Sequence, residues 1–357
     1  MHLLAPTSWS ALADWLAVRG LPKYRAAQVR KGVFGGRAES FDDLSGLPKS
    51  LRSELAAEFQ LWTTTIKEHK QSPDGTEKLL LALHDGQVIE CVLLRDGQRR
   101  TICISSQVGC AMGCVFCASG LDGVVRNLTA GEIVEQMLRL ERLLPPDERL
   151  SHIVVMGMGE PLANLKAVIP ALGEATDPAG LGISPRRITI STVGLPEAIR
   201  RLAAENSPFH LAVSLHAPDD ELRNKLVPVN KNVGIQPILA AADEYFAATG
   251  RRLTFEYVLL GGLNDRPAQA DRLVRILRGR TALLNVIPYN SVAGLPYQTP
   301  APAAVERFLG ILRQGGVNVQ VRERKGDAID AACGQLRRVR AQQDQLVELP
   351  VAAPGGT

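Results

Sequence analysis

The stretch Gln107-Val108-Gly109-Cys110-Ala111-Met112-Gly113-Cys114-Val115-Phe116-Cys117 holds three of the six cysteines in this 357-residue chain. Their spacing is C-x₃-C-x₂-C, and three thiolates can hold three corners of a cubane [4Fe–4S] cluster, which leaves the fourth iron open to a small molecule. Glycines within the stretch let the backbone curl around a bulky group, and Phe116 can shield that group from water. The alternative is structural zinc, which usually takes four ligands in two pairs. No second C-x₂-C or histidine pair exists to complete such a site.

The composition is typical of a soluble protein, with 45% hydrophobic and 22% charged residues. No apolar run approaches the roughly 18 residues of a membrane span, and the N-terminus lacks the pattern of a signal peptide. We therefore expect a cytoplasmic protein without a membrane partner. Six cysteines are too few for a disulfide framework in a chain of this length, so their clustering indicates metal or redox chemistry. A net charge of +4 permits a polyanionic partner but fits an ordinary solvated surface equally well.

Short apolar segments alternate with helical patterns over residues 106–325. The predicted strands are 101–105, 152–158, 187–193, 210–215, 252–260, 282–288 and 317–321. The helical stretches between them include 130–144, 196–204, 236–248 and 267–278. Repeated β–α units predict a parallel sheet. Six or seven strands are fewer than the eight of a closed barrel, so we expect an α/β fold with a partial, open parallel β/α barrel.

The rest of the chain divides into three further regions. Residues 1–60 predict a small helical accessory domain, which carries many basic side chains and is a candidate for RNA binding. Residues 75–105 predict a β-hairpin region, with turns at His84-Asp85-Gly86 and Arg95-Asp96-Gly97. Residues 326–357 form a C-terminal segment that carries Cys333, and its tail from about residue 340 is expected to be frayed.

A second motif, Met156-Gly157-Met158-Gly159-Glu160-Pro161, ends the strand that follows the cysteine stretch. In isolation it would be an ordinary turn. Together with the cysteine spacing and the aromatic residue before the third cysteine, it resembles the radical S-adenosylmethionine superfamily. In that superfamily, backbone groups and a carboxylate at this position meet the amino group of S-adenosylmethionine. The resemblance therefore assigns a [4Fe–4S] cluster to Cys110, Cys114 and Cys117.

Further segments narrow the resemblance to the rRNA adenine C2-methyltransferase family, which modifies adenine 2503 of 23S rRNA and, in bacterial members, adenine 37 of some tRNAs. The matching segments lie at 103–110, 156–161, 191–194, 214–217, 285–290 and 326–336. The last of these is the most specific, because it accounts for a cysteine far from the cluster motif. The resemblance spans nearly all of residues 75–336, and it is weaker in the helical N-terminal block.

The resemblance implies a role for each matched position. The S-adenosylmethionine contacts would be Gly159, Glu160, Ser191, Ser214, Leu215, His216 and Asn290, with Leu215 contributing backbone atoms. The alternative for Ser191, Ser214 and His216 is a capping or core polar role. Cys333 matches the cysteine that becomes S-methylated, Cys103 its resolving partner, and Glu90 a proton acceptor. Cys91 matches no motif and is expected to be a buried small apolar residue.

The aromatic C2 atom of adenine is not nucleophilic, so polar methyl transfer fails and the cofactor must supply a radical route. The resemblance implies two S-adenosylmethionine molecules per turnover, one that methylates Cys333 and one that is cleaved at the open iron. The Cys333 carbon would then add to C2, and Glu90 would remove the C2 proton. Attack by Cys103 on the Cys333 sulfur would release methylated RNA and leave a transient disulfide, which an external reductant must reset.

The expected partners are 23S rRNA, tRNA and a one-electron reductant, and the protein is expected to be a monomer. The target base must be unstacked to reach a buried pocket. The candidate phosphate contacts are basic side chains in two groups. They are Arg19, Lys23, Arg25, Arg30, Lys31 and Arg37 in the helical block, and Arg95, Arg99, Arg100, Arg322, Arg324 and Lys325 beyond it.

Three other functions stay open on the sequence. One is C8 methylation of the same rRNA adenine, the antibiotic-resistance activity, which uses the same cysteines; residues 120–128 resemble the C2 enzymes more closely. Another is a non-enzymatic RNA-binding protein with a structural metal. The third is a radical enzyme that acts on a protein or a small molecule, which leaves Cys103 and Cys333 without a purpose.

Overall fold

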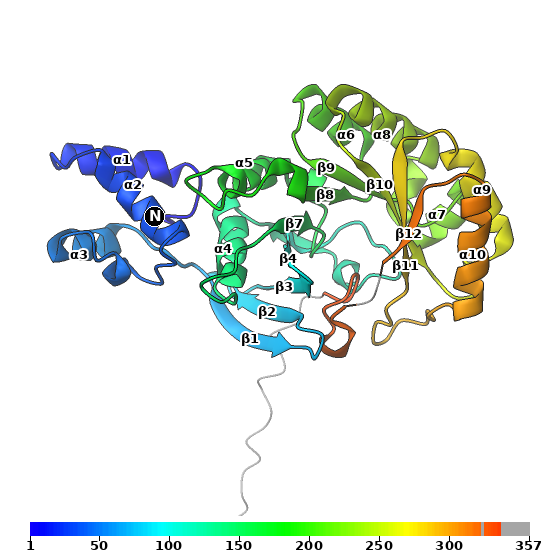
Figure 1. Ribbon diagram of the computed structural model, residues 1–357, viewed down its shortest axis with the longest axis horizontal. Coiled ribbons are helices and arrows are strands. Elements are labelled where there is room, and N and C mark those ends of the chain that lie inside the picture. Colours follow the sequence, from blue (N-terminus) through cyan, green and yellow to red (C-terminus); the bar gives the residue numbers. More distant parts are fainter. Residues whose placement is uncertain (323–324, 337–357) are drawn as a thin grey trace, which may run out of the picture.

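The fold is built on one ten-stranded mixed sheet, flanked by helices (Figure 1). It is seen in a computed structural model that describes residues 1–322 and 325–336. The strand order is β1-β2-β3-β4-β7-β8-β9-β10-β11-β12. Arg324 and the tail after residue 340 lie outside the described residues.

Seven strands of this sheet run parallel to one another, from β4 to β12. They are β4 (Arg99–Cys103), β7 (His152–Val155), β8 (Ile188–Thr192), β9 (His210–Ser214), β10 (Leu253–Leu259), β11 (Ala282–Pro288) and β12 (Val319–Val321). Within the described residues, no ladder joins the two edges of the sheet. The predicted open, partial β/α barrel is therefore confirmed.

Three antiparallel strands extend the sheet beyond β4. They are β1 (Thr65–Gln71), β2 (Glu77–Ala82) and β3 (Val88–Asp96). The sequence predicted β2 and β3 but not β1. Every residue of β1 is exposed, so this edge strand lacks the apolar residues by which a strand is predicted. A separate two-stranded ladder joins β5 (Gln107–Gly109) to β6 (Val124–Asn127).

Helices fill the connections between the parallel strands, as βαβ units require. The helices of the core are α4 (Ala130–Glu141), α5 (Leu165–Thr176), α6 (Pro196–Ala204), α7 (Asp220–Leu226), α8 (Ile235–Thr249), α9 (Pro267–Leu277) and α10 (Pro302–Gln314). Short 3₁₀ turns occupy Phe41–Asp43, Ala118–Gly120, Pro161–Asn164, Pro185–Arg187, Pro228–Asn232 and Asp327–Ile329. Helix α4 begins at a capping box in which Thr129 and Glu132 satisfy each other's backbone N–H groups.

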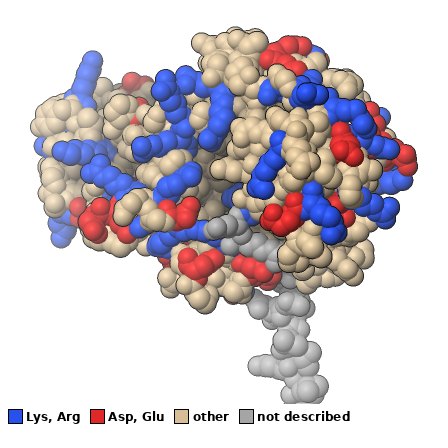
Figure 2. Space-filling model, turned by 45° about the vertical axis from the view of Figure 1, so that its right-hand side comes forward, with Lys and Arg blue, Asp and Glu red and all other residues tan. Residues whose placement is uncertain are grey.

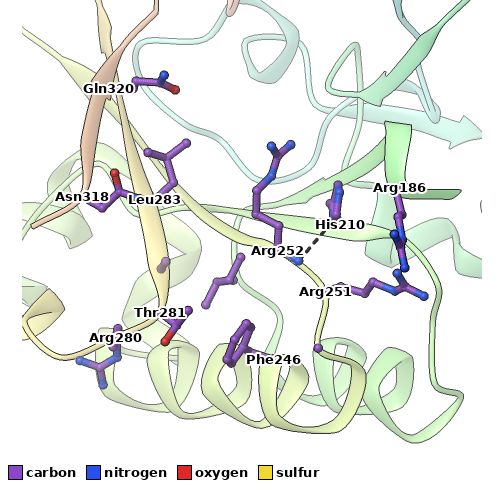
Figure 3. Close-up of a pocket in the computed structure, with 13 residues that line it drawn as sticks. Arg186, His210, Phe246, Arg251, Arg252, Arg280, Thr281, Leu283, Asn318 and Gln320 are labelled. Carbon is purple, nitrogen blue, oxygen red and sulfur yellow. Dashed lines mark hydrogen bonds between the residues drawn. The ribbon is translucent and has the colours of Figure 1, made fainter. Parts of the chain in front are cut away.

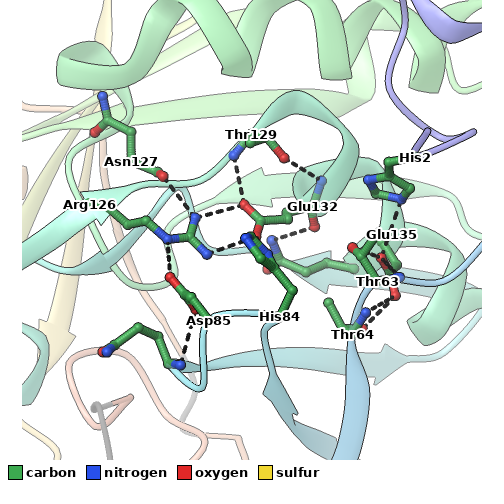
Figure 4. Close-up of polar contacts among 12 residues, drawn as sticks. His2, Thr63, Thr64, His84, Asp85, Arg126, Asn127, Thr129, Glu132 and Glu135 are labelled. Atoms are coloured by element: carbon green, nitrogen blue, oxygen red, sulfur yellow. Dashed lines mark hydrogen bonds and ion pairs between the residues drawn. The ribbon is translucent and has the colours of Figure 1, made fainter. Parts of the chain in front are cut away.

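The first 60 residues form three α-helices, α1 (Ser8–Val18), α2 (Tyr24–Phe34) and α3 (Lys49–Glu58). This N-terminal helical block contacts the core beside α4 and α5 (Figure 1). A buried carboxylate, Glu135 on α4, accepts hydrogen bonds from the backbone and hydroxyl groups of Thr63 and Thr64 (Figure 4). His2 Nε2 lies 3.4 Å from the same carboxylate. Glu135 therefore ties both ends of the helical block to the barrel.

Candidate active site

The three clustered cysteines lie on one loop that leaves β5. Gly109 has φ +77°, and a Cβ atom there would lie 2.0 Å from the Gly123 carbonyl oxygen, so only glycine allows the turn into Cys110. The Cys110 N–H donates to that carbonyl at 2.9 Å. Cys110, Cys114 and Cys117 are each half-buried. The loop therefore presents all three thiols from one compact segment.

Backbone N–H groups surround two of these thiols. The N–H groups of Met112 and Gly159 donate to Cys110, and those of Ser119 and Gly120 donate to Cys117. Burial raises the pKa of Cys110 to about 12, and each cysteine's charge raises its neighbours' pKa values further. Such N–H bonds to sulfur are how proteins support and tune iron–sulfur clusters. Among the described residues, no three His, Cys, Asp or Glu side chains converge on a single metal ion, whereas in a cubane each thiolate takes its own iron.

The Gly159-Glu160 motif lies against the β5 strand. Gly159 has φ +101°, and a Cβ atom there would lie 2.6–2.8 Å from Gln107. The Gln107 side-chain oxygen accepts the Glu160 N–H at 2.8 Å. The Glu160 carboxylate is buried and accepts the N–H groups of Leu162 and Val193 at 3.0 and 2.7 Å. Burial raises the pKa of Glu160 to about 7. No described lysine, arginine or histidine pairs with it, so a cationic amino group suits this carboxylate.

Three further predicted contacts lie at the carboxyl ends of β8 and β9, where ligands bind in such sheets. Ser191 and Ser214 lie on these strands, and His216 follows them with a left-handed φ of 58°. The His216 Nδ1 accepts the Val258 N–H at 3.1 Å, and its ring meets Phe116 edge-on with centroids 4.9 Å apart. Burial lowers the pKa of His216 to about 3, so its imidazole is neutral. Phe116 therefore links the cysteine loop to this edge of the barrel.

Arg223, on α7, holds the ends of these two strands. Its guanidinium is fully buried and donates to the carbonyls of Leu215, Ser214 and Val193 at 2.9, 2.8 and 2.5 Å. The Leu215 carbonyl also accepts the Ala217 N–H at 2.8 Å. The sequence did not reveal the role of Arg223. Most of the residues of α7 are charged or polar, and an arginine among them is expected to lie on the surface.

The C-terminal segment, residues 326–336, closes over the cysteine loop. The Ala118 N–H donates to the Gly334 carbonyl at 2.8 Å, and the Ser119 hydroxyl donates to the Leu336 carbonyl at 2.5 Å. Asn290, at the end of β11, contacts the Cys333 carbonyl through its amide nitrogen at 3.4 Å. Its amide oxygen is buried and has no hydrogen-bond donor among the described residues. A ligand with an N–H or O–H group would satisfy that oxygen.

These contacts bring Cys333 into one cavity with Cys103 and Cys117. We call this space the reactive cavity; its volume is about 720 Å³. Burial, followed by the charge of Cys333, raises the pKa of Cys103 to about 12. The Arg322 guanidinium lines the same cavity, and the Cys333 thiolate is the main cause of its raised pKa. Arg322, predicted from the sequence as a phosphate contact, therefore lies beside the two thiols.

Glu90 is buried on β3 and does not line the reactive cavity. Its carboxylate pairs with Lys78 Nζ at 2.8 Å, and the same ammonium donates to the Asp330 carbonyl at 3.0 Å. Lys78 thus joins Glu90 to the segment that carries Cys333. Sequence reasoning also missed Lys78, because its partner Asp330 is 252 residues away. Cys91, predicted to be buried, is fully buried.

Residues 104–274 match the radical SAM superfamily model. A probable dual-specificity RNA methyltransferase RlmN from Rhodopirellula baltica is 63% identical over 96% of this chain and 92% of its own length. The RlmN of Symbiobacterium thermophilum is 46% identical over 95% and 92%. This chain belongs to the RlmN family. A radical SAM methyltransferase from Sphaerobacter thermophilus shares the fold with a TM-score of 0.89 and 44% identity, covering 92% of this chain and 97% of that one.

Membership makes the chain a radical SAM methyltransferase, and the superfamily uses a [4Fe–4S] cluster and S-adenosylmethionine. The described residues fit both groups. The cysteine loop offers thiols with N–H donors. Glu160 offers a buried carboxylate with no cationic partner among the described residues, and the Asn290 amide oxygen is a buried acceptor without a described donor. No described helix is long and apolar enough to span a membrane.

Proposed function

We propose that this chain methylates C2 of adenine 2503 in 23S rRNA and C2 of adenine 37 in tRNAs. The observation that carries the proposal is the reactive cavity, in which Cys103 and Cys333 meet beside Cys117. A radical enzyme that acts directly on its substrate needs no such pair of thiols. Two thiols at one site suit a carbon carrier and its release partner.

Cys110, Cys114 and Cys117 would hold the cluster, and Gly159, Glu160, Ser191, Ser214, Leu215, His216 and Asn290 would hold S-adenosylmethionine. When bound, these groups supply the electron and the carbon radical that an unreactive C–H bond requires. Glu160 would orient the amino group of the cofactor through its buried carboxylate. Neutral His216 and Phe116 would exclude water from that edge of the barrel.

The two thiols would act in order. Cys333 would accept a methyl group from the first of two S-adenosylmethionine molecules, and Arg322 would stabilise its thiolate before that transfer. Methylation removes the negative charge of Cys333, which is one cause of the raised pKa of Cys103. Cys103 would then ionise more readily. Once the Cys333 carbon has bonded to adenine C2, Cys103 would attack the Cys333 sulfur and break its S–C bond, so that the carbon leaves on the RNA as the new methyl group and a transient disulfide forms.

We retain Glu90 as the proposed acceptor of the C2 proton. It lies outside the lining of the reactive cavity, so the proton would have to pass beyond that lining, and Lys78 joins Glu90 to the Cys333 segment. An external reductant would supply two electrons to return the disulfide to two thiols, with two protons from solvent, and one electron to the cluster. We further propose that the protein works as a monomer in the cytoplasm and that its N-terminal helical block contributes to RNA binding.

The test traces labelled methyl from S-adenosylmethionine through anaerobically reconstituted protein into a 23S rRNA transcript. Wild-type protein should carry label on Cys333 and transfer it to adenine C2. Cys333→Ala should label neither protein nor RNA. Cys103→Ala should label the protein and accumulate a covalent protein–RNA adduct on a denaturing gel. Cys91→Ala is the control, because Cys91 lies outside the reactive cavity, and it should turn over normally.

Three outcomes would contradict the proposal. Turnover by Cys333→Ala would remove the carbon-carrier role. Mass spectrometry that locates the new methyl only at C8 would replace the C2 assignment. The cluster assignment would be wrong if the protein, prepared anaerobically, were colourless and contained zinc instead of being brown.

A further inference from the structure

A second pocket, of about 720 Å³, opens at the amino-terminal ends of the parallel strands, opposite the cysteine loop. Its walls come from the loops that enter β8, β9, β10 and β11 (Figure 3). The charged or titratable side chains in these walls are Arg186, His210, Arg251, Arg252 and Arg280. We call this feature the basic mouth. None of these residues was singled out from the sequence.

The basic mouth adjoins the reactive cavity. Arg186, Arg252, Leu283 and Gln320 line both spaces. The reactive cavity therefore runs through the barrel, from Cys333 at one end to arginines at the other. A base that enters from the basic mouth would approach the two thiols along this path.

Most arginines at or beside this mouth have no acidic partner. Arg186 and Arg252 of the mouth are exposed, as is Arg187 in the lining of the adjoining reactive cavity, and Arg251 is half-buried. Within residues 1–322 and 325–336, none of the four forms an ion pair; of the arginines that line the mouth, only Arg280 does, with Asp243 at 3.1 Å. Buried Glu256 interacts with Arg252 over a longer range, but its carboxylate accepts from Asn285 at 2.7 Å. Four guanidinium groups therefore remain available to an external anion.

Several of the basic residues that the sequence predicted as phosphate contacts already have partners within the protein. Arg30 pairs with Glu174 and Asp177, Arg95 with Glu77, Arg100 with Glu148, and Lys325 with Asp96. Arg37 donates to three backbone carbonyls. Acidic side chains also lie among the basic ones on the face in Figure 2. Lys23, Arg25, Lys31 and Arg99 also form no ion pair among the described residues. What distinguishes the basic mouth is therefore its position at the end of the reactive cavity, with which it shares Arg186 and Arg252.

The pKa values of two histidines are lowered by the arginines at this end of the barrel. Burial lowers the pKa of His152 to about 4, and Arg99, Arg187 and Arg252 lower it further. Burial also lowers the pKa of His210, with contributions from Arg252, Arg251 and Arg186. Both histidines are therefore neutral at pH 7 and leave the guanidinium groups as the charged donors.

We propose that the basic mouth binds backbone phosphates of the substrate RNA next to the target adenine, so that the unstacked base enters the reactive cavity from this end. The inference rests on the proposed function. Arginine suits the task because its planar fork donates two hydrogen bonds to one phosphate and stays charged. Phosphate contacts of this kind set position and register without selecting sequence, which suits an enzyme that accepts both rRNA and tRNA.

The test measures binding of a 23S rRNA hairpin and a tRNA transcript by fluorescence anisotropy over a series of KCl concentrations. Each lost phosphate contact lowers the slope of log affinity against log salt by about 1. Arg186→Gln/Arg252→Gln should lower the slope by about 2 for both RNAs and weaken binding by roughly tenfold or more at low salt. Arg186→Lys/Arg252→Lys should retain most of the slope, because the positive charges remain.

The matched control is Arg307→Gln/Arg313→Gln, which removes the same charge from exposed positions on α10. This control should bind both RNAs with the wild-type slope. Equal slopes for the mouth variant, the control and the wild type would overturn the inference, as would equal losses in both double variants. If wild-type protein neither binds nor methylates either RNA, the proposed function fails instead. Wild-type methylation with an unaltered mouth-variant slope would make this inference alone wrong.

Discussion

Lys78 and Glu90 form an ion pair that is closed to solvent on both sides. Their side chains are 6% and 5% exposed, and Nζ lies 2.8 Å from the carboxylate. Lys78 Nζ also donates a hydrogen bond to the Asp330 carbonyl. The pair therefore joins the hairpin region to the Cys333 segment through a single ammonium group.

Replacing Lys78→Met should lower the free energy of unfolding by about 3–5 kcal/mol, because it removes the cationic half of a buried ion pair and the donor to the Asp330 carbonyl. Urea denaturation followed by circular dichroism measures the loss. Lys225→Met is the matched control, since Lys225 and Glu221 are an exposed pair on α7, and it should cost only about 0.3–0.5 kcal/mol. Similar small losses in both variants would mean that water reaches the Lys78–Glu90 pair.

At the scale of elements, α7 serves as a clamp for the carboxyl ends of β8 and β9. Arg223 is its only side chain that reaches carbonyls of both strands in the described structure, and the Asn230 side-chain oxygen accepts from the same guanidinium at 2.5 Å. Burial lowers the pKa of Arg223 to about 10, so it remains charged at neutral pH. Ser214, Leu215 and His216 thus depend on a helix that follows them.

Arg223→Lys should weaken S-adenosylmethionine binding by roughly 5- to 100-fold, which corresponds to about 1–3 kcal/mol for buried carbonyls left without donors. Equilibrium dialysis with reconstituted protein measures this affinity. Arg272→Lys provides the comparison, because Arg272 pairs with Asp219 at the start of the same helix but is exposed. An unchanged affinity in Arg223→Lys would show that the strand ends hold their shape without the guanidinium.

At the scale of the whole molecule, the N-terminal helical block is held to the barrel by a few buried polar contacts. Glu135 is fully buried and accepts four hydrogen bonds from Thr63 and Thr64. Arg30, on α2, pairs at 2.7 Å with Glu174 in the last turn of α5 and at 2.9 Å with Asp177, which follows that helix. The attachment therefore depends on side chains from three separate parts of the sequence.

Glu135→Ala should loosen this attachment, because two threonine N–H groups lose a buried acceptor. Hydrogen exchange should accelerate by at least about tenfold over residues 1–64, equivalent to roughly 1.4 kcal/mol, while β8–β11 stay protected. Glu39→Ala is the control, since Glu39 meets Arg142 at the same interface from an exposed position. Uniform acceleration over the whole chain would show that Glu135 stabilises the barrel itself and not the attachment.

Much of the fold and part of the site could be predicted from local patterns. Alternating apolar and helical segments predicted all seven parallel strands. The cysteine spacing with the Gly159-Glu160 motif predicted the superfamily, and further segments, above all residues 326–336, predicted the family. The edge strand β1 could not be predicted, because an exposed strand carries no apolar period. The roles of Lys78 and Arg223 were equally hidden, since a charged side chain reveals its burial only once its partners are known.

The sequence alone determined the chemistry available to this protein, because cluster spacing, glycine-dependent turns and strand patterns are local properties of the chain. Tertiary structure decided which of those groups act together. Ala118 and Ser119 bind the C-terminal segment and so place Cys333 beside Cys103 in the reactive cavity. Folding likewise pairs many basic residues with carboxylates, whereas Arg186, Arg251 and Arg252 at the basic mouth form no ion pair among the described residues. Electrostatic pairing acts through space between distant parts of the chain, so no linear pattern could reveal it.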